Sequence, residues 1–414
     1  MPAAVEGGMM CGMVEGVLDI DGTFGEGGGQ ILRTALALAC AAGRAFRITN
    51  IRAKRSNPGL ARQHLACVEA ARNICAARVS GALLRSAELE FHPGPVRAGD
   101  YRFDVGTAGS ATLVAQTVLP ALFVADAPSR VTIDGGTHNP WAPPFDFLAE
   151  VFLPAIALMG FRAEASLERH GFYPAGGGRI SLAVEPAGAP AALDLTASPG
   201  EIEWTGRIYD SMLPPQVAES ERSLMRRAIP AMGRIEHRRV VDSPGPGNCV
   251  MAVATWAASP QENSCAGTNA TPATAPGTTI PPAPTRRLEK TILTAFGQKG
   301  KPARAVVEEL REQCERFAAA GAPVDEHLAD QLLIYMALVT SRARSAGSAA
   351  PEPGAKAPYP CQAGAAEPAI PCRFATGPLN LHATTNMAVI EKFLPVGFAV
   401  EATAAGHVVS CVAA

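Results

Sequence analysis

The residues from Asp21 to Thr34, DGTFGEGGGQILRT, combine a run of glycines with an acid, an amide and a cation. Glycine lets backbone N–H groups approach a ligand closely, and the start of a helix offers unpaired donors to an anion. A helix that begins near Gly29 would place Gln30 and Arg33 on one face, directly after Glu26. This combination suits a nucleotide phosphate with its metal ion. It matches neither the dinucleotide fingerprint nor a Walker loop, and a glycine-rich turn that caps a core helix is the alternative.

A basic cluster follows one helix later. Arg52 and Arg55 come directly after a strand-like run at 46–51, and Gln63 and His64 open the next helical pattern. The planar guanidinium group of arginine suits phosphate oxygens. We expect the cluster at the same end of the strands as the glycine loop, where it would bind phosphate. A solvated basic loop is the alternative.

Further glycine-rich turns occur at 106–110, 135–140 and 170–178. With the first loop they indicate a set of loops that line one ligand cleft. Gln116 lies in an apolar helical pattern, where a satisfied core amide is the ordinary interpretation. Pattern alone does not select His382 as a nucleophile, because a histidine before a helix is commonly a cap or surface residue. No Ser-His-Asp or Cys-His arrangement can be assembled from the spacing.

The bulk properties narrow the class of protein. The chain has 414 residues and a net charge of −2, so nucleic acid could be contacted only through a local basic patch. The longest apolar stretch, 113–125, contains Gln116 and Pro120 and is too short to span a bilayer, so no membrane contact is expected. There is no pattern of a secretory signal. Ten cysteines without a C-x-x-C pair indicate no zinc site or disulfide framework, which favours a reduced, cytoplasmic protein.

The chain alternates short β-like runs with helices, which predicts an α/β (α+β) fold. Similar helix pairs are expected at 29–42 with 60–77, 110–124 with 145–159, and 328–339 with 385–394. The late third pair predicts a large domain at 1–187 and 321–414, interrupted by a small α/β module at 188–320. That module has strand patterns at 201–209 and 250–256 and helical patterns at 217–229 and 304–318. Two segments rich in Ala and Pro, 258–287 and 342–371, are expected to be flexible loops.

Seven motifs in this order resemble the RNA 3′-terminal phosphate cyclase family. They are GEGGGQILR from Gly25, IRAKRSNPGLARQH from Ile51, GTAGSATLVAQTVLPAL from Gly106, GGTHNPWAPP from Gly135, RHGFYPAGGG from Arg169, HLADQL from His327 and HATTNMAVIEKFLP from His382. The resemblance covers the large domain nearly end to end, whereas the module at 188–320 matches poorly. It implies three βαβαββ repeats, each like the C-terminal domain of translation initiation factor 3, with the small module inserted before the third.

The resemblance also implies a reaction. His382 would attack the α-phosphate of ATP and form an adenylyl-histidine. AMP would then pass to the 3′-phosphate of an RNA end, and the vicinal 2′-hydroxyl would close a 2′,3′-cyclic phosphate. A neutral imidazole is nucleophilic near pH 7, and each displacement at phosphorus needs positive charge and a divalent metal, Mg or Mn.

Matched positions imply further roles. Glu26 would contact the metal or the nucleotide. The resemblance implies that Arg33, Arg52 and Arg55 clamp phosphate groups. It also implies that Gln63 and His64 lie on the side of the site that faces the RNA phosphate. The ATP site would comprise Glu26, Arg33, Gln116, His327, Leu328, Ala329, Asp330 and Gln331, with His327 stacked on the adenine. Asp330 and Gln331 could fix the nucleotide or orient His382.

Two other functions stay open at this point. Some relatives act in ribosome biogenesis and lack the nucleophilic histidine, but His382 is present here. Enolpyruvyl transferases share a related repeated architecture and need no adenylylated histidine. The oligomeric state, the physiological RNA and the choice between ATP and GTP are left open by the sequence.

Overall fold

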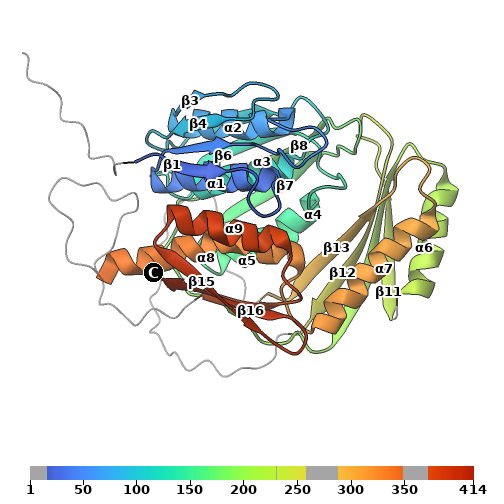
Figure 1. The fold of residues 1–414 in the computed structure, drawn as a ribbon. Helices are drawn as coiled ribbons and strands as arrows, with labels where there is room; N and C mark the ends of the chain where they lie inside the picture. Colours follow the sequence, from blue (N-terminus) through green and yellow to red (C-terminus); the bar gives the residue numbers. More distant parts are fainter. Residues whose placement is uncertain (1–15, 230, 258–287, 348–371) are drawn as a thin grey trace, which may run out of the picture.

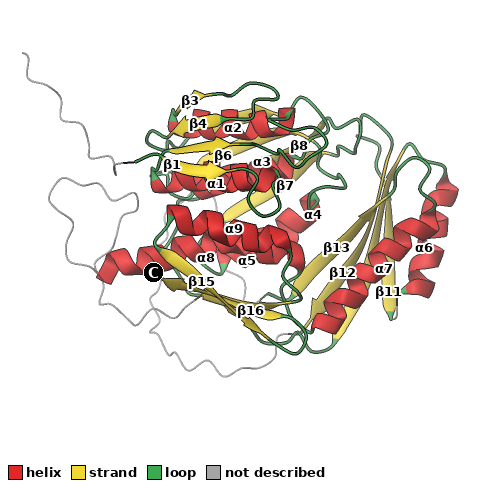
Figure 2. Cartoon of the chain, viewed as in Figure 1, coloured by secondary structure: helices red, strands yellow, loops and turns green. Residues whose placement is uncertain are grey.

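The computed structural model describes residues 16–229, 231–257, 288–347 and 372–414. Within them the chain forms a mixed α/β structure with several small mixed sheets, each of four strands (Figures 1 and 2). The segment at 258–287, expected to be a loop, lies outside the described residues. Most of the second expected loop, 342–371, also lies outside them, but its first residues extend the preceding helix to Gly347. Alanine and arginine favour helix and glycine ends it, so this loop begins later than its composition suggested.

The first sheet belongs to the N-terminal part of the chain. Its segment contains β1 (Leu18–Asp21), α1 (Gly29–Ala42), β2 (Phe46–Thr49), α2 (Arg62–Cys75), β3 (Arg78–Ser80) and β4 (Leu89–His92). The strand order is β1-β2-β4-β3. β1 pairs with β2 in parallel, and the remaining pairs are antiparallel. The parallel pair needs a crossover, which α1 supplies.

The second sheet has the corresponding order β5-β6-β8-β7, again with a parallel first pair. Its segment contains β5 (Asp100–Asp104), α3 (Ala111–Leu122), β6 (Ser129–Gly135), α4 (Phe145–Phe147), η1 (Leu148–Phe152), α5 (Leu153–Ala157), β7 (Ala163–Arg169) and β8 (Gly178–Val184). α4, the π-helical segment η1 and α5 follow one another without a break, where one helix was expected over 145–159.

The third sheet joins segments far apart in the sequence. It contains β9 (Asp194–Leu195), β14 (Cys372–Thr376), β15 (Val396–Ala402) and β16 (His407–Ala413), with α8 (Glu326–Gly347) and α9 (Leu381–Phe393). Its order is β15-β16-β14-β9, and β9 pairs with β14 in parallel. β9 falls inside the range 188–320 that the sequence assigned to the insert, yet it pairs with the C-terminal sheet. We call these three sheets and their helices the main body.

An intervening module separates β9 from α8. It comprises β10 (Ile202–Ser211), α6 (Pro215–Ala228), β11 (Met232–Arg239), β12 (Gly247–Trp256), β13 (Lys290–Phe296) and α7 (Ala303–Ala320). Its sheet has the order β11-β10-β12-β13. α6 and α7 pack on this sheet, and β13 also contacts α4 and η1 of the main body (Figure 1). β12 is therefore buried almost throughout, since a strand covered on both faces has no polar side.

The centre of the main body is built around α1. Nearly all its side chains are buried, because it packs against α2, α3 and α9 on different sides. Ala35, Ala37, Ala39 and Ala41 keep these helices close together, while Leu32, Leu36 and Leu38 fill the space between them. A helix so enclosed has a fixed N-terminal turn, and that turn carries the glycine loop.

Candidate active site

A cavity of about 1160 Å³ lies between the main body and the intervening module. Its lining includes most of the residues expected at the site: Glu26, Arg33, Arg52, Arg55, Gln63, His64, Gln116, His327, Asp330, Gln331 and His382. The N-terminal turns of α1, α2, α8 and α9 contribute Gln30, Arg62, His327 and His382, and the start of α3 contributes Gly109. Helix N-termini carry partial positive charge and unpaired N–H groups, so their convergence favours a polyanionic ligand.

His382 occupies the first turn of α9, which Asn380 caps by accepting a hydrogen bond from the Ala383 N–H at 2.9 Å. The ring nitrogen Nδ1 lies 2.9 Å from Oε1 of Gln30. Gln30 Nε2 in turn donates to both carboxylate oxygens of Asp330, at 2.6 and 2.5 Å. Because the amide nitrogen faces a carboxylate, the amide oxygen must face His382, and Nδ1 must carry the hydrogen. The lone pair is thereby left on Nε2, which has no hydrogen bond within the described residues.

The surroundings keep His382 neutral. Burial lowers its pKa below the usual range, and the positive charges of Arg33 and Arg55 act in the same direction against the raising effect of Asp330. Burial raises the pKa of Asp330, while the hydrogen bond from Gln30 favours the ionised carboxylate. An unprotonated imidazole with a fixed tautomer is a competent nucleophile near neutral pH.

A second side-chain amide, that of Asn386, also forms hydrogen bonds to Asp330. Asn386 Nδ2 donates to the backbone oxygen and to Oδ1 of Asp330, at 2.9 and 3.0 Å. Thr34 then donates to Oδ1 of Asn386 at 2.7 Å, which fixes the orientation of that amide. α1, α8 and α9 are thus connected by one buried network that ends at the imidazole of His382.

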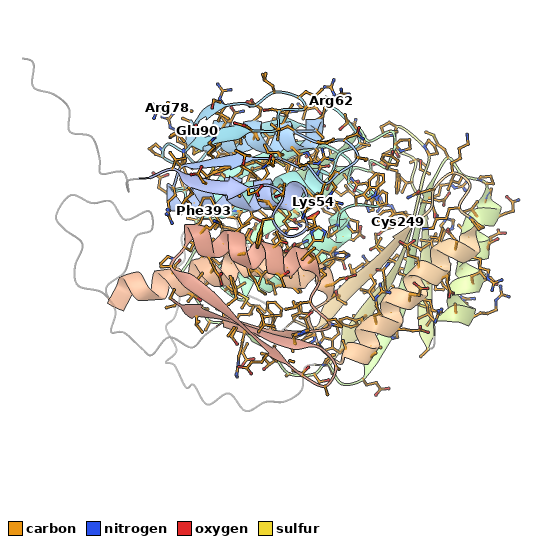
Figure 3. The ribbon with its side chains drawn as sticks, in the orientation of Figure 1. Lys54, Arg62, Arg78, Glu90, Cys249 and Phe393 are labelled. Atoms are coloured by element: carbon orange, nitrogen blue, oxygen red, sulfur yellow. The ribbon has the colours of Figure 1, made fainter. Side chains whose placement is uncertain are left out.

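The glycine loop brings an acid to the same imidazole. Glu26 Oε2 lies 3.4 Å from His382 Nδ1, and Glu26 Oε1 forms an ion pair with Arg55. The Glu26 N–H donates to Thr385 Oγ1 at 3.1 Å, so the loop rests on α9. Gly25 has φ +53° and a Cβ there would lie 2.0 Å from Thr385 Oγ1, so only glycine fits. Lys54, which is labelled in Figure 3, donates from Nζ to the Gly25 oxygen at 3.1 Å and so connects the basic cluster to the loop.

The other basic and polar residues of the cluster also face the cavity. Arg33 is partly buried and makes no ion pair within the described part of the chain, and desolvation lowers its pKa. Arg52 Nη1 donates to the Gly59 oxygen at 2.8 Å. His64 Nδ1 accepts a hydrogen bond from the Ala61 N–H at 3.2 Å, which leaves Nε2–H as its donor. Burial and the nearby Arg33 and Arg52 lower the pKa of His64 to about 3, so it remains neutral.

Of the residues expected to bind the nucleotide, some line the cavity and others lie in the core. Gln116 Nε2 and Gln331 Oε1 are buried without a hydrogen-bond partner, and both residues line the cavity. A buried amide donor and acceptor without partners fit the edge of a base. His327 lines the same space, with its ring edge-on to Phe147 at 6.5 Å. Leu328 and Ala329, by contrast, are 0 % and 1 % exposed and belong to the core beneath.

Some contacts and lining residues of the site were not anticipated. Gln30 was expected to act near phosphate, and its contact with His382 spans 352 residues of sequence. Asn386 could have been noticed as a polar residue one turn after His382 in an apolar helix. Thr294, Gln313 and Arg316 come from the intervening module, whose pattern carried no signal of a site.

A divalent metal has one candidate ligand here. Within the described residues no group of three His, Cys, Asp or Glu side chains could hold a metal ion. Glu26 Oε2 is buried without a hydrogen-bond partner, which fits a single carboxylate ligand. Magnesium commonly uses one or two carboxylates and takes its other ligands from substrate phosphates and water.

Comparison with known proteins identifies the family. A sequence model described as RNA 3′-terminal phosphate cyclase matches residues 24–400. A protein of that name from Ralstonia nicotianae is 40 % identical over 387 residues, which covers 93 % of this chain and 94 % of that protein. Another from Salmonella enteritidis is 38 % identical over 396 residues, with 95 % and 98 % covered. The chain therefore belongs to the RNA 3′-terminal phosphate cyclase family, which is a family of enzymes.

Proposed function

We propose that this enzyme converts the 3′-terminal phosphate of an RNA to a 2′,3′-cyclic phosphate, using ATP and a covalent adenylyl-histidine at His382. The observation that carries the proposal is the hydrogen-bonded series His382–Gln30–Asp330 in a cavity lined by arginines and helix N-termini. It supports a nucleophilic imidazole beside a site for phosphates.

In the first step His382 Nε2 attacks the α-phosphorus of ATP, and the bond from that phosphorus to the oxygen of pyrophosphate breaks. The imidazole, now bonded at Nε2 and still protonated at Nδ1, becomes positively charged. Gln30 Oε1 accepts the Nδ1 hydrogen bond, and the carboxylates of Asp330 and Glu26 stabilise the charge. Arg33 and Arg55 would stabilise the phosphate oxygens in the transition state.

In the second step an oxygen of the RNA 3′-phosphate attacks the AMP phosphorus, and the P–N bond to His382 breaks. The histidine returns to its neutral form. In the third step the 2′-hydroxyl attacks the 3′-phosphorus, loses its proton and displaces AMP. Arg52, Gln63 and His64 would bind the RNA phosphate, with His64 acting as a neutral N–H donor because its pKa is low.

The nucleotide would occupy the side of the cavity formed by Gln116, His327 and Gln331, with His327 against the adenine. Asp330 acts through Gln30 on His382 in this proposal. Leu328 and Ala329 support the wall from the core. Glu26 would hold a divalent metal, Mg or Mn, which when bound neutralises phosphate charge.

The three sheets of the main body share one strand order, which in the first sheet is β1-β2-β4-β3. We further propose that they are copies of one βαβαββ repeat, each like the C-terminal domain of translation initiation factor 3. The large domain would span 1–187 and 321–414, with 188–320 as the insert. The pairing of β9 with β14 supports a later start of the insert, after Leu195.

None of the described helices could cross a membrane. We propose a cytoplasmic location, which the free thiols of the described cysteines support.

The test is product formation with a single-stranded RNA that carries a labelled 3′-phosphate. Conversion of the label to a phosphatase-resistant form that requires ATP supports the proposal. An oligonucleotide with a 2′-deoxy terminal nucleotide should not be cyclised, because the attacking hydroxyl is missing. A folded chain that adenylylates no residue and cyclises no RNA would instead favour the role in ribosome biogenesis or an enolpyruvyl-transferase-like reaction.

A further inference from the structure

Two exposed aromatic side chains stand at the same cavity as His382. Trp141 is 68 % exposed and Tyr173 is 46 % exposed, and both line the cavity. Trp141 lies in the loop between β6 and α4, and Tyr173 in the loop between β7 and β8. Large aromatic rings contribute most to stability when buried, so exposed rings at a binding cavity point to a ligand with an aromatic face.

The geometry of the pair leaves ring faces open. The two ring centroids are 4.7 Å apart and the planes meet at 87°. In a perpendicular pair each ring keeps at least one face that its partner does not cover. A planar group can therefore stack on this pair without separating the rings.

The loops that carry the two rings are held together by their backbones. The N–H groups of Thr137 and His138 both donate to the Gly171 oxygen, at 2.9 and 3.1 Å. The Gly171 N–H donates to Thr137 Oγ1 at 2.9 Å. Below them, His138 Nε2 lies 2.9 Å from the buried carboxylate of Asp146. A pair on such a support is positioned before any ligand arrives.

The cavity has room and charge for a second ligand. Its volume of about 1160 Å³ exceeds the ~300–1,000 Å³ typical of a site for one small molecule. Arg62 lines it, is exposed, and makes no ion pair within the described ranges. Open aromatic faces and an unpaired cation on the wall of one cavity are the elements with which proteins bind single-stranded nucleic acid, the rings for bases and the cation for phosphate.

We propose that Trp141 and Tyr173 form a stacking platform for a nucleobase near the 3′ end of the RNA, with Arg62 at its backbone. The inference rests on the proposed function, in which the RNA end enters this cavity. It assigns a subsite for a base, apart from the residues of α3 and α8 proposed for ATP. Stacking accepts any base, so the platform holds the strand without selecting its sequence.

The first test measures binding of a 5′-labelled single-stranded RNA with a 3′-phosphate to the full chain, without ATP. Trp141→Ala should weaken binding about tenfold, since a stacked base contributes roughly 1–3 kcal/mol. Trp141→Phe should restore most of the affinity. Leu83→Ala, an exposed apolar position outside the cavity, is the matched control and should bind as the wild type does.

Intrinsic fluorescence gives a second readout. The other tryptophans, Trp204 and Trp256, are 9 % and 7 % exposed and lie in the intervening module. Quenching by the RNA should therefore come from Trp141 and should disappear in Trp141→Phe. An RNA with an abasic terminal nucleotide, or one abasic at a neighbouring position, should lose affinity for the wild type but not for Trp141→Ala.

The outcomes separate the two proposals. Equal RNA affinity of the wild type and Trp141→Ala, or quenching by ATP but not by RNA, overturns the platform. If the wild type binds RNA with quenching but takes up no label from ATP, the platform is supported and the proposed reaction is contradicted.

Discussion

In the proposed function, the reactivity of His382 would depend on a neutral amide, that of Gln30, placed between the imidazole and a buried acid. Gln30 lies between Asp330 and the imidazole, so Asp330 orients the amide without itself forming a hydrogen bond to His382, and the Glu26 carboxylate 3.4 Å from Nδ1 forms none either. A direct carboxylate partner would raise the pKa of the histidine and favour the protonated, unreactive form. With the amide between them, the tautomer is fixed while the pKa stays low.

The pH dependence of adenylylation follows from this arrangement. The pKa of His382 is lowered, so its neutral form persists as the pH falls through 6.5, where an ordinary histidine becomes protonated. We therefore expect the midpoint of the acid-side fall in the rate of labelling by [α-³²P]ATP to lie below pH 6.5. An inflection at or above 6.5 would contradict this account of the site.

Gln30→Ala should separate positioning from folding. Without the amide, Nδ1 loses its acceptor and the lone pair is no longer confined to Nε2. Misplacing one group in this way typically costs 10²–10³ in rate for preorganised sites, and we expect a loss of about 100-fold in labelling. Gln30 is buried and donates to the carboxylate of Asp330, so the variant should also lose about 1–3 kcal/mol of unfolding free energy, and labelling is compared where urea titration shows that both proteins are folded. A rate equal to that of the wild type would show that the tautomer is set elsewhere.

At the scale of elements, much of the helix pattern was predictable from the sequence. The helix at 29–42 is confirmed with its bounds, because an apolar run follows the glycines and Gly43 ends it. The strand β11 was missed since its residues, MGRIEHRR, are mostly exposed and charged and show no alternation. The contact of Gln30 with Asp330 and His382 could not be predicted from spacing, because it requires the packing of helices about 300 residues apart.

The glycine loop offers a test at this scale. Gly25 and Gly43 both have positive φ, +53° and +67°, but a Cβ at Gly25 would meet Thr385 whereas the space at Gly43 is open. Gly25→Ala should displace Glu26 and abolish most labelling. Gly43→Ala should cost only about 1 kcal/mol of stability and keep full activity. Equal activities of the two variants would mean that the loop has no fixed position.

At the scale of the whole molecule, the intervening module forms one side of the cavity, and ion pairs connect it to the main body. Arg207 of β10 donates to Asp146 at 3.1 Å and to Glu150 at 2.5 and 2.9 Å. Lys290 of β13 also donates to Glu150, at 3.0 Å. These partners pull the pKa of Glu150 below its usual range against the effect of burial. The sequence predicted a separate module but gave no indication of this attachment.

Arg207→Met should lower the free energy of unfolding by about 2–3 kcal/mol, since hydrogen bonds to the charged Asp146 and Glu150 are lost in a partly buried site. The control is Arg47→Ala, which removes an exposed pair with Glu88 and should leave the free energy of unfolding nearly unchanged. Urea titration of both variants measures the difference. Similar losses in the two would show that the module is held chiefly by apolar packing.

The central claim, that His382 carries the adenylyl group, is tested most directly by covalent labelling. The purified chain is incubated with [α-³²P]ATP and a divalent metal, and the protein is separated on a denaturing gel. We predict a labelled wild type, an unlabelled His382→Ala, and a labelled control His92→Ala, whose histidine pairs with Glu90 away from the cavity. Label retained in folded His382→Ala, or absent from the folded wild type, would contradict the account.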